Sequence, residues 1–496
     1  MNVLAIDVGT TSMRGILFNG GGKIVSSASH ATPLLFIGPL IEQSPAVYTD
    51  TLLHLCKEIS KDHTVDAITL TAFRSAPALV DMEGNALTNF VMWQDKRNRA
   101  ICDALSPFDD AVYATCGASV NTVFTAGKIS WFRQNMPEIY QSAHKAMIVP
   151  DFMICFMTGA FVTDYTYGSR TSLMDLRSLS WDKGMCELFH VDMDKLCGLI
   201  PQGSIAGYTT KPFSKLSGIR EGVPVISAGG DQQCGALGLG VLDSSALEVN
   251  SGTGSFIISV IDEPILGNKS VICNVAAIPG KYTVESNVLS SASALNWLMR
   301  TSFPDLVMQG GDPDFEAFNH LAEMAPPGAN GLLCVPHFQG CGTRKWDPSA
   351  KAGLWGFTLA TTRCDLARGL YEGIAAEITK SVAALPKACH QAREVYIAGG
   401  LTRGDIFDRI LCDMLGLNLI RYENEQATAI GAFTSAAVTL GLFPDYAAAI
   451  AAARSADRIE RYTPRSEVVN MYQGYKAATE ALFQCANQSG AQMGAM

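Results

Sequence analysis

Short apolar runs separated by polar turns open the chain. Residues 2–7 form the first run, and residues 13–19 form a second after a turn rich in glycine and hydroxyl side chains. Because a strand, a tight turn and a strand make a β-hairpin, we expect a hairpin here, and residues 24–32 can add a third strand. Residues 48–62 carry apolar side chains at helical spacing, and residues 65–72 are typical of a buried strand. The pattern predicts an α/β domain.

A similar order of elements recurs in the second half of the chain. Residues 247–260 again have the pattern of strand, Gly/Ser/Thr turn and strand, and residues 282–289 add another strand. A long amphipathic helix is expected over residues 362–385, then a strand that ends in two glycines over residues 393–400 and a helix over residues 405–416. Two such turns about 240 residues apart indicate two copies of one nucleotide-binding half.

Length and composition agree with two folded halves. At 496 residues the chain exceeds the size of one ordinary hydrophobic core. We place the boundary near Asp243, so that residues 1–243 and 244–496 form two domains with a central cleft. The residues are 48% hydrophobic and 17% charged, which is typical of a globular protein. The net charge of -10 argues against nucleic acid as a partner, because phosphate backbones are bound by clustered Lys and Arg.

The sequence also predicts where the protein works. No apolar run approaches the roughly 18 residues that a membrane helix needs. Asp7 and Arg14 interrupt the apolar character of the first 19 residues, so a signal peptide is not expected either. The 14 cysteines are scattered without a CxxC pair or a neighbouring His cluster, so a zinc site is not expected. Free thiols in a large acidic chain favour a reducing cytoplasm.

The first turn has the residue types of a phosphate site. Its glycine lets backbone N–H groups approach an anion, and Thr10 and Thr11 add hydroxyl donors. Asp7 offers the oxygen ligand that Mg²⁺ prefers. An ordinary polar turn between two strands would explain the stretch equally well. The later turn at residues 251–254 and the glycines within residues 398–400 make an ordered set of three, which favours phosphate binding.

Seven motifs follow one another along nearly the whole chain. They are IDVGTTSMRG at 6–15, MWQDKRN at 92–98, VFTAGKISWFRQN at 123–135, GGDQQCGALG at 229–238, NSGTGSF at 250–256, WDPSAKAGLWGF at 346–357 and IAGGLTRGDIFDRILCDMLG at 397–416. Their order resembles the FGGY carbohydrate kinases, a family that includes glycerol kinases, xylulokinases and ribulokinases. The resemblance implies two actin-like (ribonuclease H-like) ATPase domains, each a mixed sheet flanked by helices, that close over ATP and a sugar or polyol.

The resemblance also implies roles for single residues. The family's carboxylate that takes the proton of the attacking hydroxyl matches Asp231, which is therefore expected to be the general base. Taken alone, Asp231 is equally typical of a helix N-cap, and the two interpretations are compatible because a helix N-terminus stabilises an ionised carboxylate. Asp7 matches the carboxylate on the Mg²⁺ side. The implied nucleotide residues are Thr10, Thr11 and Arg14 beside the β- and γ-phosphates, Gly252 and Thr253 in the second turn, and Gly399, Gly400 and Asp405 in the adenosine segment. The alternative for Arg14 is a solvated strand arginine.

The substrate side is expected at Arg74, Ser75, Trp93, Asp231 and Gln232. The resemblance to glycerol kinases is incomplete here. They have Glu at the position of Ser75 and Tyr at the position of Val123, so this chain lacks two of their contacts with the polyol. Arg74 suits a carboxylate, as in an aldonate, because its guanidinium forms paired hydrogen bonds with carboxylates. The alternative for Arg74 is an ion pair with Asp95. Trp93 lies either against the sugar or in the core.

Several functions stay open at this point. The leading expectation is a kinase that uses ATP and Mg²⁺ to phosphorylate a hydroxyl of a ketopentose, as xylulokinases do. A glycerol, other polyol or aldonate kinase of the same family is the alternative. An actin-fold ATPase or a sugar sensor without kinase activity belongs to another class, and the presence of Asp231 argues against the sensor. The expected partner is a small sugar or polyol, with neither nucleic acid nor membrane, and a homodimer is the assembly left open.

Overall fold

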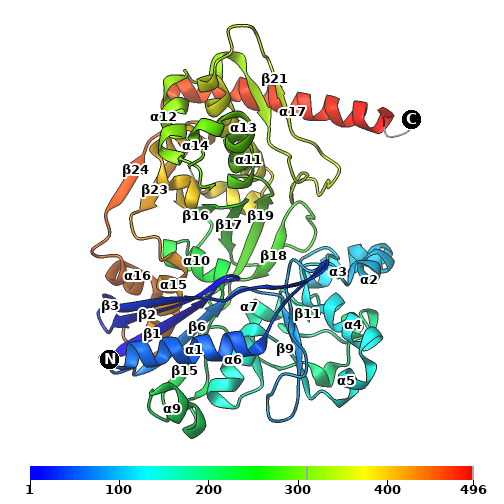
Figure 1. The fold of residues 1–496 in the computed structure, drawn as a ribbon, viewed down its shortest axis with the longest axis vertical. Coiled ribbons are helices and arrows are strands. Elements are labelled where there is room, and N and C mark those ends of the chain that lie inside the picture. The colour runs from blue at the N-terminus through cyan, green and yellow to red at the C-terminus, as the bar shows by residue number, and fades with distance from the viewer. Residues whose placement is uncertain (309–310, 494–496) are drawn as a thin grey trace.

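Two separate sheets form the frame of the protein in this computed structural model, which describes residues 1–308 and 311–493. In Figure 1 the early elements form the lower lobe, and most elements after residue 246 form the upper lobe. The helices α15 (Ala427–Thr439) and α16 (Tyr446–Ala453) return to the lower lobe and lie beside its sheet. The expected arrangement of two mixed sheets with flanking helices is confirmed. The boundary near Asp243 stays a prediction.

The first sheet has six strands. In spatial order they are β14 (Ile205–Tyr208), β15 (Pro224–Gly230), β6 (Ala67–Ala72), β1 (Asn2–Val8), β2 (Ser12–Asn19) and β3 (Ile24–Ala31). β1 and β2 form the predicted hairpin, with Asp7 opposite Arg14, and β3 adds the predicted third strand. Helix α1 (Pro45–Ser60) buries Tyr48, Leu52, Leu55, Cys56 and Ile59, the face that its spacing predicts.

Further helices and short strands complete the lower lobe. The helices are α2 (Arg99–Leu105), α3 (Asp109–Cys116), α4 (Thr125–Asn135), α5 (Pro137–Ser142), α6 (Val149–Thr158), α7 (Tyr165–Gly168), α8 (Lys183–Leu188), α9 (Lys211–Ser217) and α10 (Asp231–Leu239). The short strands are β4 (Leu35–Ile37), β5 (Leu40–Gln43), β7 (Pro77–Val80), β8 (Phe90–Val91), β9 (Lys145–Ile148), β10 (Val162–Asp164), β11 (Met174–Asp175), β12 (Ser180–Trp181) and β13 (Gly198–Ile200).

The second sheet has seven strands. In spatial order they are β18 (Ile272–Val275), β19 (Tyr282–Val288), β17 (Ser255–Ile261), β16 (Ala246–Ser251), β22 (Glu394–Ala398), β23 (Asn418–Tyr422) and β24 (Ile459–Tyr462). The other elements of this lobe are α11 (Ala292–Ser302), α12 (Phe315–Met324), α13 (Arg363–Ala383), α14 (Asp405–Leu415), α17 (Ser466–Met493), β20 (Leu333–Val335) and β21 (Gly353–Trp355). The predicted second hairpin is β16–β17, and the predicted long helix is α13.

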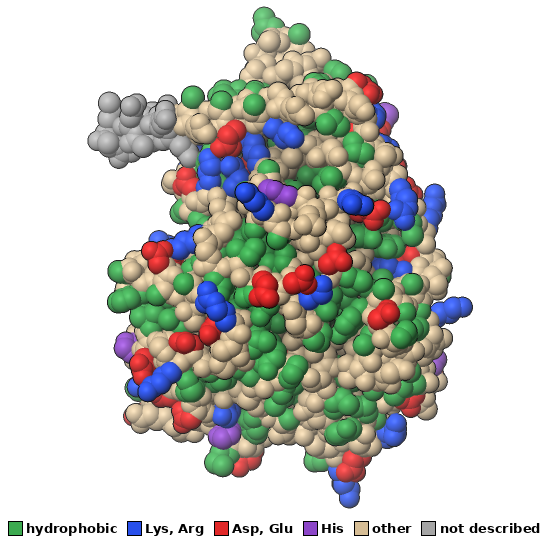
Figure 2. Space-filling view, turned by 180° about the vertical axis from the view of Figure 1, so that it is seen from behind, with side chains coloured by type: hydrophobic (Ala, Val, Ile, Leu, Met, Phe, Trp, Pro, Cys, Tyr) green, Lys and Arg blue, Asp and Glu red, His purple; other side chains and the backbone are tan. Residues whose placement is uncertain are grey.

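Short 3₁₀ turns link these elements: η1 (Ser106–Phe108), η2 (Met193–Lys195), η3 (Pro304–Leu306), η4 (Ala329–Gly331), η5 (Lys387–Gln391) and η6 (Gly400–Arg403). Seen from behind, the molecule narrows between its lobes on one side, and Lys and Arg side chains gather on the upper lobe above this notch (Figure 2). Across both described ranges, no helix combines the length and the apolar character that crossing a membrane requires.

The parallel strands of each sheet end at a common edge. In the first sheet β1, β6 and β15 run parallel, and Ala72 pairs with both Val8 and Gly230, so these three strands end level with one another. In the second sheet β16 and β22 run parallel, with Asn250 beside Ala398. Residues that follow the carboxyl ends of parallel strands gather at one edge, where ligands of open α/β sheets bind. Each predicted phosphate turn lies at such an edge.

Helices α10 and α15 cross where the two halves of the chain meet. Their apolar side chains share one core with strands of the first sheet, and Thr69 of β6 donates a hydrogen bond from its hydroxyl to the Ala432 carbonyl at 3.1 Å. Two glycines bring the helices this close. A Cβ added at Gly238 would lie 1.9 Å from the Ala427 oxygen, and one at Gly431 would lie 1.8 Å from the Cys234 oxygen.

Replacing Gly431 by alanine should therefore destabilise the protein strongly, by about 3 kcal/mol or more, because the clash is with backbone on both sides and cannot relax through a rotamer change. The matched control is Gly474→Ala, which places the same methyl group in helix α17 with no heavy atom within 4 Å. Urea unfolding followed by circular dichroism measures both. Equal stability of the two variants would contradict the close crossing.

Candidate active site

The first phosphate turn is closed by a short backbone hydrogen bond. The Gly9 N–H donates to the Ser12 carbonyl at 2.8 Å, which leaves Thr10 and Thr11 at the tip of the hairpin. The indole N–H of Trp93 donates to the Thr10 hydroxyl at 3.2 Å. Trp93 is 38% exposed, so the alternative that placed it in the core is wrong. An exposed aromatic face therefore lies directly beside the turn.

Asp7 and Arg14 flank this turn on adjacent strands. Burial, followed by the charge of Asp231, raises the pKa of Asp7 from 3.8 to about 7, and Arg14 opposes that rise. Ionising the buried Asp7 carboxyl is costly, and a bound cation would offset that cost. Mg²⁺ fits this position because it prefers carboxylate and water oxygens as ligands. Arg14 is exposed, as its alternative interpretation expected, but it also donates to the Gln426 side-chain oxygen at 3.5 Å, at the N-terminal end of α15.

Asp231 occupies the first position of helix α10. The N-cap is Gly230, so the interpretation of Asp231 as the N-cap is wrong by one residue, and Asp231 lies just inside the helix. Its Oδ1 accepts a hydrogen bond from the Gln232 backbone N–H at 2.8 Å, and its side chain is 26% exposed. Burial raises the pKa of Asp231, while the nearby Arg74 lowers it. The carboxylate is thus held at a helix N-terminus and remains accessible from one side.

Arg74 is the centre of a buried charge cluster. Its Nε lies 3.6 Å from Asp231 Oδ1, its Nη1 lies 3.3 Å from Glu285 Oε2, and its Nη1 donates to the Gln233 side chain at 3.2 Å. The expected alternative, an ion pair with Asp95, is wrong. Asp95 is instead held by Arg97, two residues further on, through two hydrogen bonds of 2.9 Å. Arg74 therefore joins the catalytic candidate to the second sheet.

Glu285 and Arg170 belong to this cluster and were missed by sequence reasoning. Glu285 lies in β19 of the second sheet, and Arg170 Nη1 approaches its Oε1 at 3.9 Å. Although burial opposes it, Arg74 and Arg170 together hold the pKa of Glu285 below its ordinary value. The guanidinium of Arg170 also lies 4.8 Å from the centre of the Phe124 ring. A lone acidic residue in the middle of a predicted strand is the one signal that could have drawn attention to Glu285.

Ser75 and Gln232 are the remaining predicted substrate residues. Ser75 is buried, and its hydroxyl donates to the Arg170 carbonyl at 3.4 Å. Its φ of 73° lies in the left-handed region, which serine adopts rarely, so the backbone after Arg74 is held in a strained turn. Gln232 follows Asp231 in the first turn of α10. The structure places both residues beside the charge cluster.

The second phosphate turn packs against the start of helix α11. The Thr253 carbonyl accepts hydrogen bonds from the backbone N–H groups of Ser291 at 2.9 Å and of Ser293 at 3.2 Å. Space around Gly252 is open, since a Cβ there would meet no heavy atom within 4 Å, whereas one at Gly254 would lie 2.5 Å from the Val288 oxygen. The turn is therefore held by α11 and β19 on the side of Thr253 and Gly254, and it is accessible at Gly252.

The adenosine segment adjoins this second turn. A Cβ added at Gly399, whose φ is 96°, would lie 2.5 Å from the Ser251 oxygen, so the two turns touch through backbone. Gly400 faces open space. Asp405 is engaged differently: it accepts hydrogen bonds from Arg421 at 2.8 Å and from the Tyr462 hydroxyl at 2.9 Å. These partners lower the pKa of Asp405 and tie the start of α14 to β23 and β24.

These positions together form a two-lobed arrangement that suits a nucleotide-dependent enzyme. One lobe offers a hydroxyl-rich turn and a carboxylate, the other lobe offers a second turn and a glycine-rich segment, and a charged cluster lies between the two sheets. Such an arrangement can hold a polyphosphate between two turns and present an acceptor to a carboxylate.

Comparison with known proteins identifies the family. The N-terminal domain of the FGGY family of carbohydrate kinases matches residues 2–238, and the C-terminal domain of that family matches residues 247–440. The chain belongs to the FGGY family of carbohydrate kinases. The protein is therefore a carbohydrate kinase with two actin-like domains, as the motifs led us to expect.

Individual relatives act on different acceptors. A glycerol kinase of Thermococcus kodakarensis is 28% identical over 500 residues, which cover 96% of each chain. A xylulose kinase of Staphylococcus epidermidis is 25% identical over 98% of this chain and 97% of its own. The solved xylulose kinase from Rhodospirillum rubrum aligns with a TM-score of 0.91 at 24% identity over 98% of this chain and 99% of its own. A gluconate kinase from Lactobacillus acidophilus aligns with a TM-score of 0.89 at 21% identity over 98% of each chain. The fold and the class agree across them, and the sugar differs.

Glu248 is a buried carboxyl whose ionisation should lower the stability of the folded protein. It lies fully buried in β16, and burial, opposed by Asn250 and reinforced by Glu285, raises its pKa from 4.5 to about 8. A carboxyl whose pKa is raised on folding stabilises the fold below pH 4.5, and this stabilisation is lost as the pH rises through about 8.

Glu248→Gln should therefore match the wild type in melting temperature at pH 5 and exceed it by about 3 °C or more at pH 9, because glutamine cannot ionise. Differential scanning calorimetry across this range, without nucleotide, measures the difference. Glu263→Gln on the surface is the matched control. Parallel pH profiles for Glu248→Gln and the wild type would contradict the shift.

Proposed function

We propose that the protein transfers the terminal phosphoryl group of Mg²⁺-bound ATP to a hydroxyl of a small neutral sugar, most directly a ketopentose, with Asp231 as general base. The observation that carries this proposal is the placement of Asp231. It stands at the N-terminus of α10, partly accessible, level with the edge of the sheet from which the first phosphate turn extends. A carboxylate in this place can accept the proton of an acceptor hydroxyl.

The electrostatics of Asp231 suit a base that works near neutral pH. Burial raises its pKa above that of an ordinary aspartate, which strengthens it as a proton acceptor. Arg74 at 3.6 Å and the helix N-terminus favour the ionised form, so the carboxylate stays available for the proton. These two influences oppose each other, and their balance fits the requirement for a base that is both charged and basic.

The phosphate side is proposed to use both turns. Thr10, Thr11 and Arg14 would bind the β- and γ-phosphates from the first lobe, and Gly252 with Thr253 would bind them from the second. Asp7 would hold Mg²⁺, which when bound neutralises phosphate charge. Gly399 and Gly400 would border adenosine: Gly399 lets the segment pack against the second turn, and Gly400 leaves room, because a Cβ there would meet no heavy atom within 4 Å. Asp405 would border this region, where Arg421 already binds one of its oxygens.

The charge balance of the cluster favours a neutral acceptor. The two guanidinium groups of Arg74 and Arg170 face two carboxylates, those of Asp231 and Glu285. A substrate carboxylate would have to displace Glu285 from Arg74 and would lie beside Asp231, at an electrostatic cost. The fold likeness to a gluconate kinase keeps an aldonate as the alternative. Glycerol is disfavoured because Ser75 turns its hydroxyl toward the Arg170 carbonyl and offers no carboxylate.

Replacing Asp231 by asparagine should lower kcat by a factor of about 10³ or more while leaving ATP binding within about threefold, because the variant keeps the shape and removes the proton acceptor. A coupled ADP-release assay measures kcat, and fluorescence titration with a nucleotide analogue measures binding. The control is Asp243→Asn, an exposed carboxylate outside the cluster. A kcat near that of the wild type would show that another group takes the proton.

Glu285→Gln should change which acceptors are used. Removing its charge leaves Arg74 and Arg170 opposed by Asp231 alone, so kcat/KM for an aldonate should rise relative to that for a ketopentose by about tenfold or more. The measurement is ADP release from D-xylulose, D-ribulose, glycerol and D-gluconate by wild type and variant, with Glu263→Gln as the control. A wild type that prefers glycerol or gluconate to every ketopentose would overturn the proposed substrate class and leave the kinase assignment intact.

A further inference from the structure

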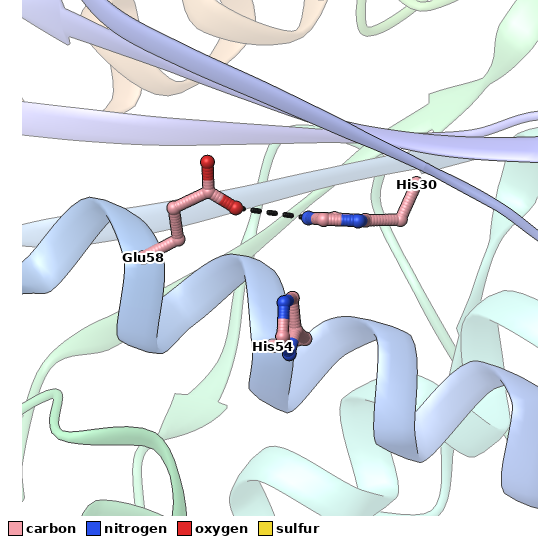
Figure 3. A group of neighbouring side chains, drawn as sticks. All are labelled: His30, His54 and Glu58. Carbon is pink, nitrogen blue, oxygen red and sulfur yellow. Dashed lines mark hydrogen bonds and ion pairs between the residues drawn. The ribbon is translucent and has the colours of Figure 1, made fainter.

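Two histidines and a glutamate gather on the surface of the lower lobe, away from the charge cluster (Figure 3). His30 comes from β3, and His54 and Glu58 come from α1. His30 Nε2 lies 2.9 Å from Glu58 Oε2, and the rings of His30 and His54 have centroids 4.7 Å apart, nearly perpendicular. One ligand atom from each of the three side chains lies within 4.8 Å of the other two.

The local fold explains why these side chains meet. His54 and Glu58 are four residues apart in a helix, so they project from the same face one turn apart. The alternation of β3 turns His30 to the same side as Ala28, which packs against the apolar core that includes α1. The three residues are half-buried or exposed, with 34% of the His30 side chain and 52% of the Glu58 side chain accessible. A solvated cation can therefore reach them.

We propose that His30, His54 and Glu58 form a binding site for one borderline divalent cation of the Zn²⁺ type, with water completing the coordination. Two imidazoles and one carboxylate are a donor set that Zn²⁺ takes in proteins, whereas Mg²⁺ prefers oxygen ligands alone. Ligand bonds of about 2.0–2.1 Å in tetrahedral geometry place donor atoms about 3.3 Å apart. The present separations of 2.9 Å and up to 4.8 Å bracket that value, so small rotamer changes suffice.

A second group of similar composition is less suited to a cation. His337, Cys341 and Glu377 also lie close together, but they are buried. Glu377 is already bound by Arg344 at 2.9 Å and approached by Lys380 at 3.8 Å. Two positive side chains on the only carboxylate of that group oppose a further cation. The surface group has no such competitor among the ion pairs of the described residues, since its carboxylate pairs with His30 alone.

The place of the proposed site gives it a structural consequence. β3 is the outer strand of the first sheet, and His30 lies opposite Met13 in the neighbouring strand. Two residues further on, the Thr32 N–H donates to the Thr11 carbonyl at 2.8 Å, in the first phosphate turn. A cation bound by β3 and α1 would fasten this edge strand to the helix beneath it. Binding to the folded state alone raises the melting temperature.

The test uses the full-length protein, freed of metal by chelation and without nucleotide. Isothermal titration with ZnCl₂ measures affinity, and the absorption spectrum with Co²⁺ reports tetrahedral coordination. The wild type should bind one equivalent of Zn²⁺ that His54→Ala and Glu58→Gln weaken by about tenfold or more. His320→Ala is the matched control, since His320 pairs with Glu323 at 3.7 Å without a second histidine. Zn²⁺ should also raise the melting temperature of the wild type and of the control by several degrees more than that of His54→Ala.

Two results would overturn the proposal. Unchanged Zn²⁺ affinity in both His54→Ala and Glu58→Gln would show that these side chains hold no cation, and loss of binding in Cys341→Ser instead would assign it to the buried group. Absence of measurable binding to the wild type at about 100 μM Zn²⁺ would also overturn the proposal. His54, Glu58 and His320 lie on the surface, and melting temperatures that match the wild type without metal show that each variant, Cys341→Ser included, is folded.

Discussion

The buried guanidinium of Arg74 is the interaction on which the site depends. It leaves the end of β6 in one sheet and pairs with Asp231 at the start of α10 and with Glu285 in the other sheet. Removing one partner of a buried ion pair leaves an uncompensated charge, which is strongly unfavourable, so this cluster links the two sheets. The two predicted phosphate turns lie in different sheets, one between β1 and β2 and the other between β16 and β17. The α10–α15 crossing supports the same geometry, because it packs the end of the second half of the chain onto the first sheet.

Much of the frame could be predicted from the sequence because it is encoded locally. Alternating apolar runs around a glycine-rich turn specify the β1–β2 hairpin, and helical spacing specifies α1 and α13. The helix start at Asp231 follows from the glycines before it. What local pattern could not supply was the partner of each charge. Glu285 is 211 residues away from Arg74, while Asp95, the expected partner, is satisfied by Arg97 two residues along the chain. The hydrophobic spacing within α15 likewise does not indicate that this helix packs on the first lobe.

Several carboxyl groups of the site are costly to ionise in the folded protein. Asp7, Asp231 and Glu248 all have raised pKa values, and burial is the largest cause for each. Three carboxylates that resist ionisation so close together destabilise the protein without ligands, a pattern expected where binding of cations and phosphates supplies the compensation. The backbone of Ser75, directly after Arg74, is also strained. Stability and activity therefore make opposite demands on these residues.

The most direct test of the central claim is a crystal structure with Mg²⁺, a non-hydrolysable ATP analogue and a ketopentose bound together. We expect the acceptor hydroxyl within hydrogen-bonding distance of an Asp231 carboxylate oxygen, at about 2.6–3.2 Å, with the terminal phosphate between the turn at Thr10 and Thr11 and the turn at Gly252 and Thr253. A sugar bound with all of its hydroxyls remote from Asp231, or a terminal phosphate outside both turns, would contradict it.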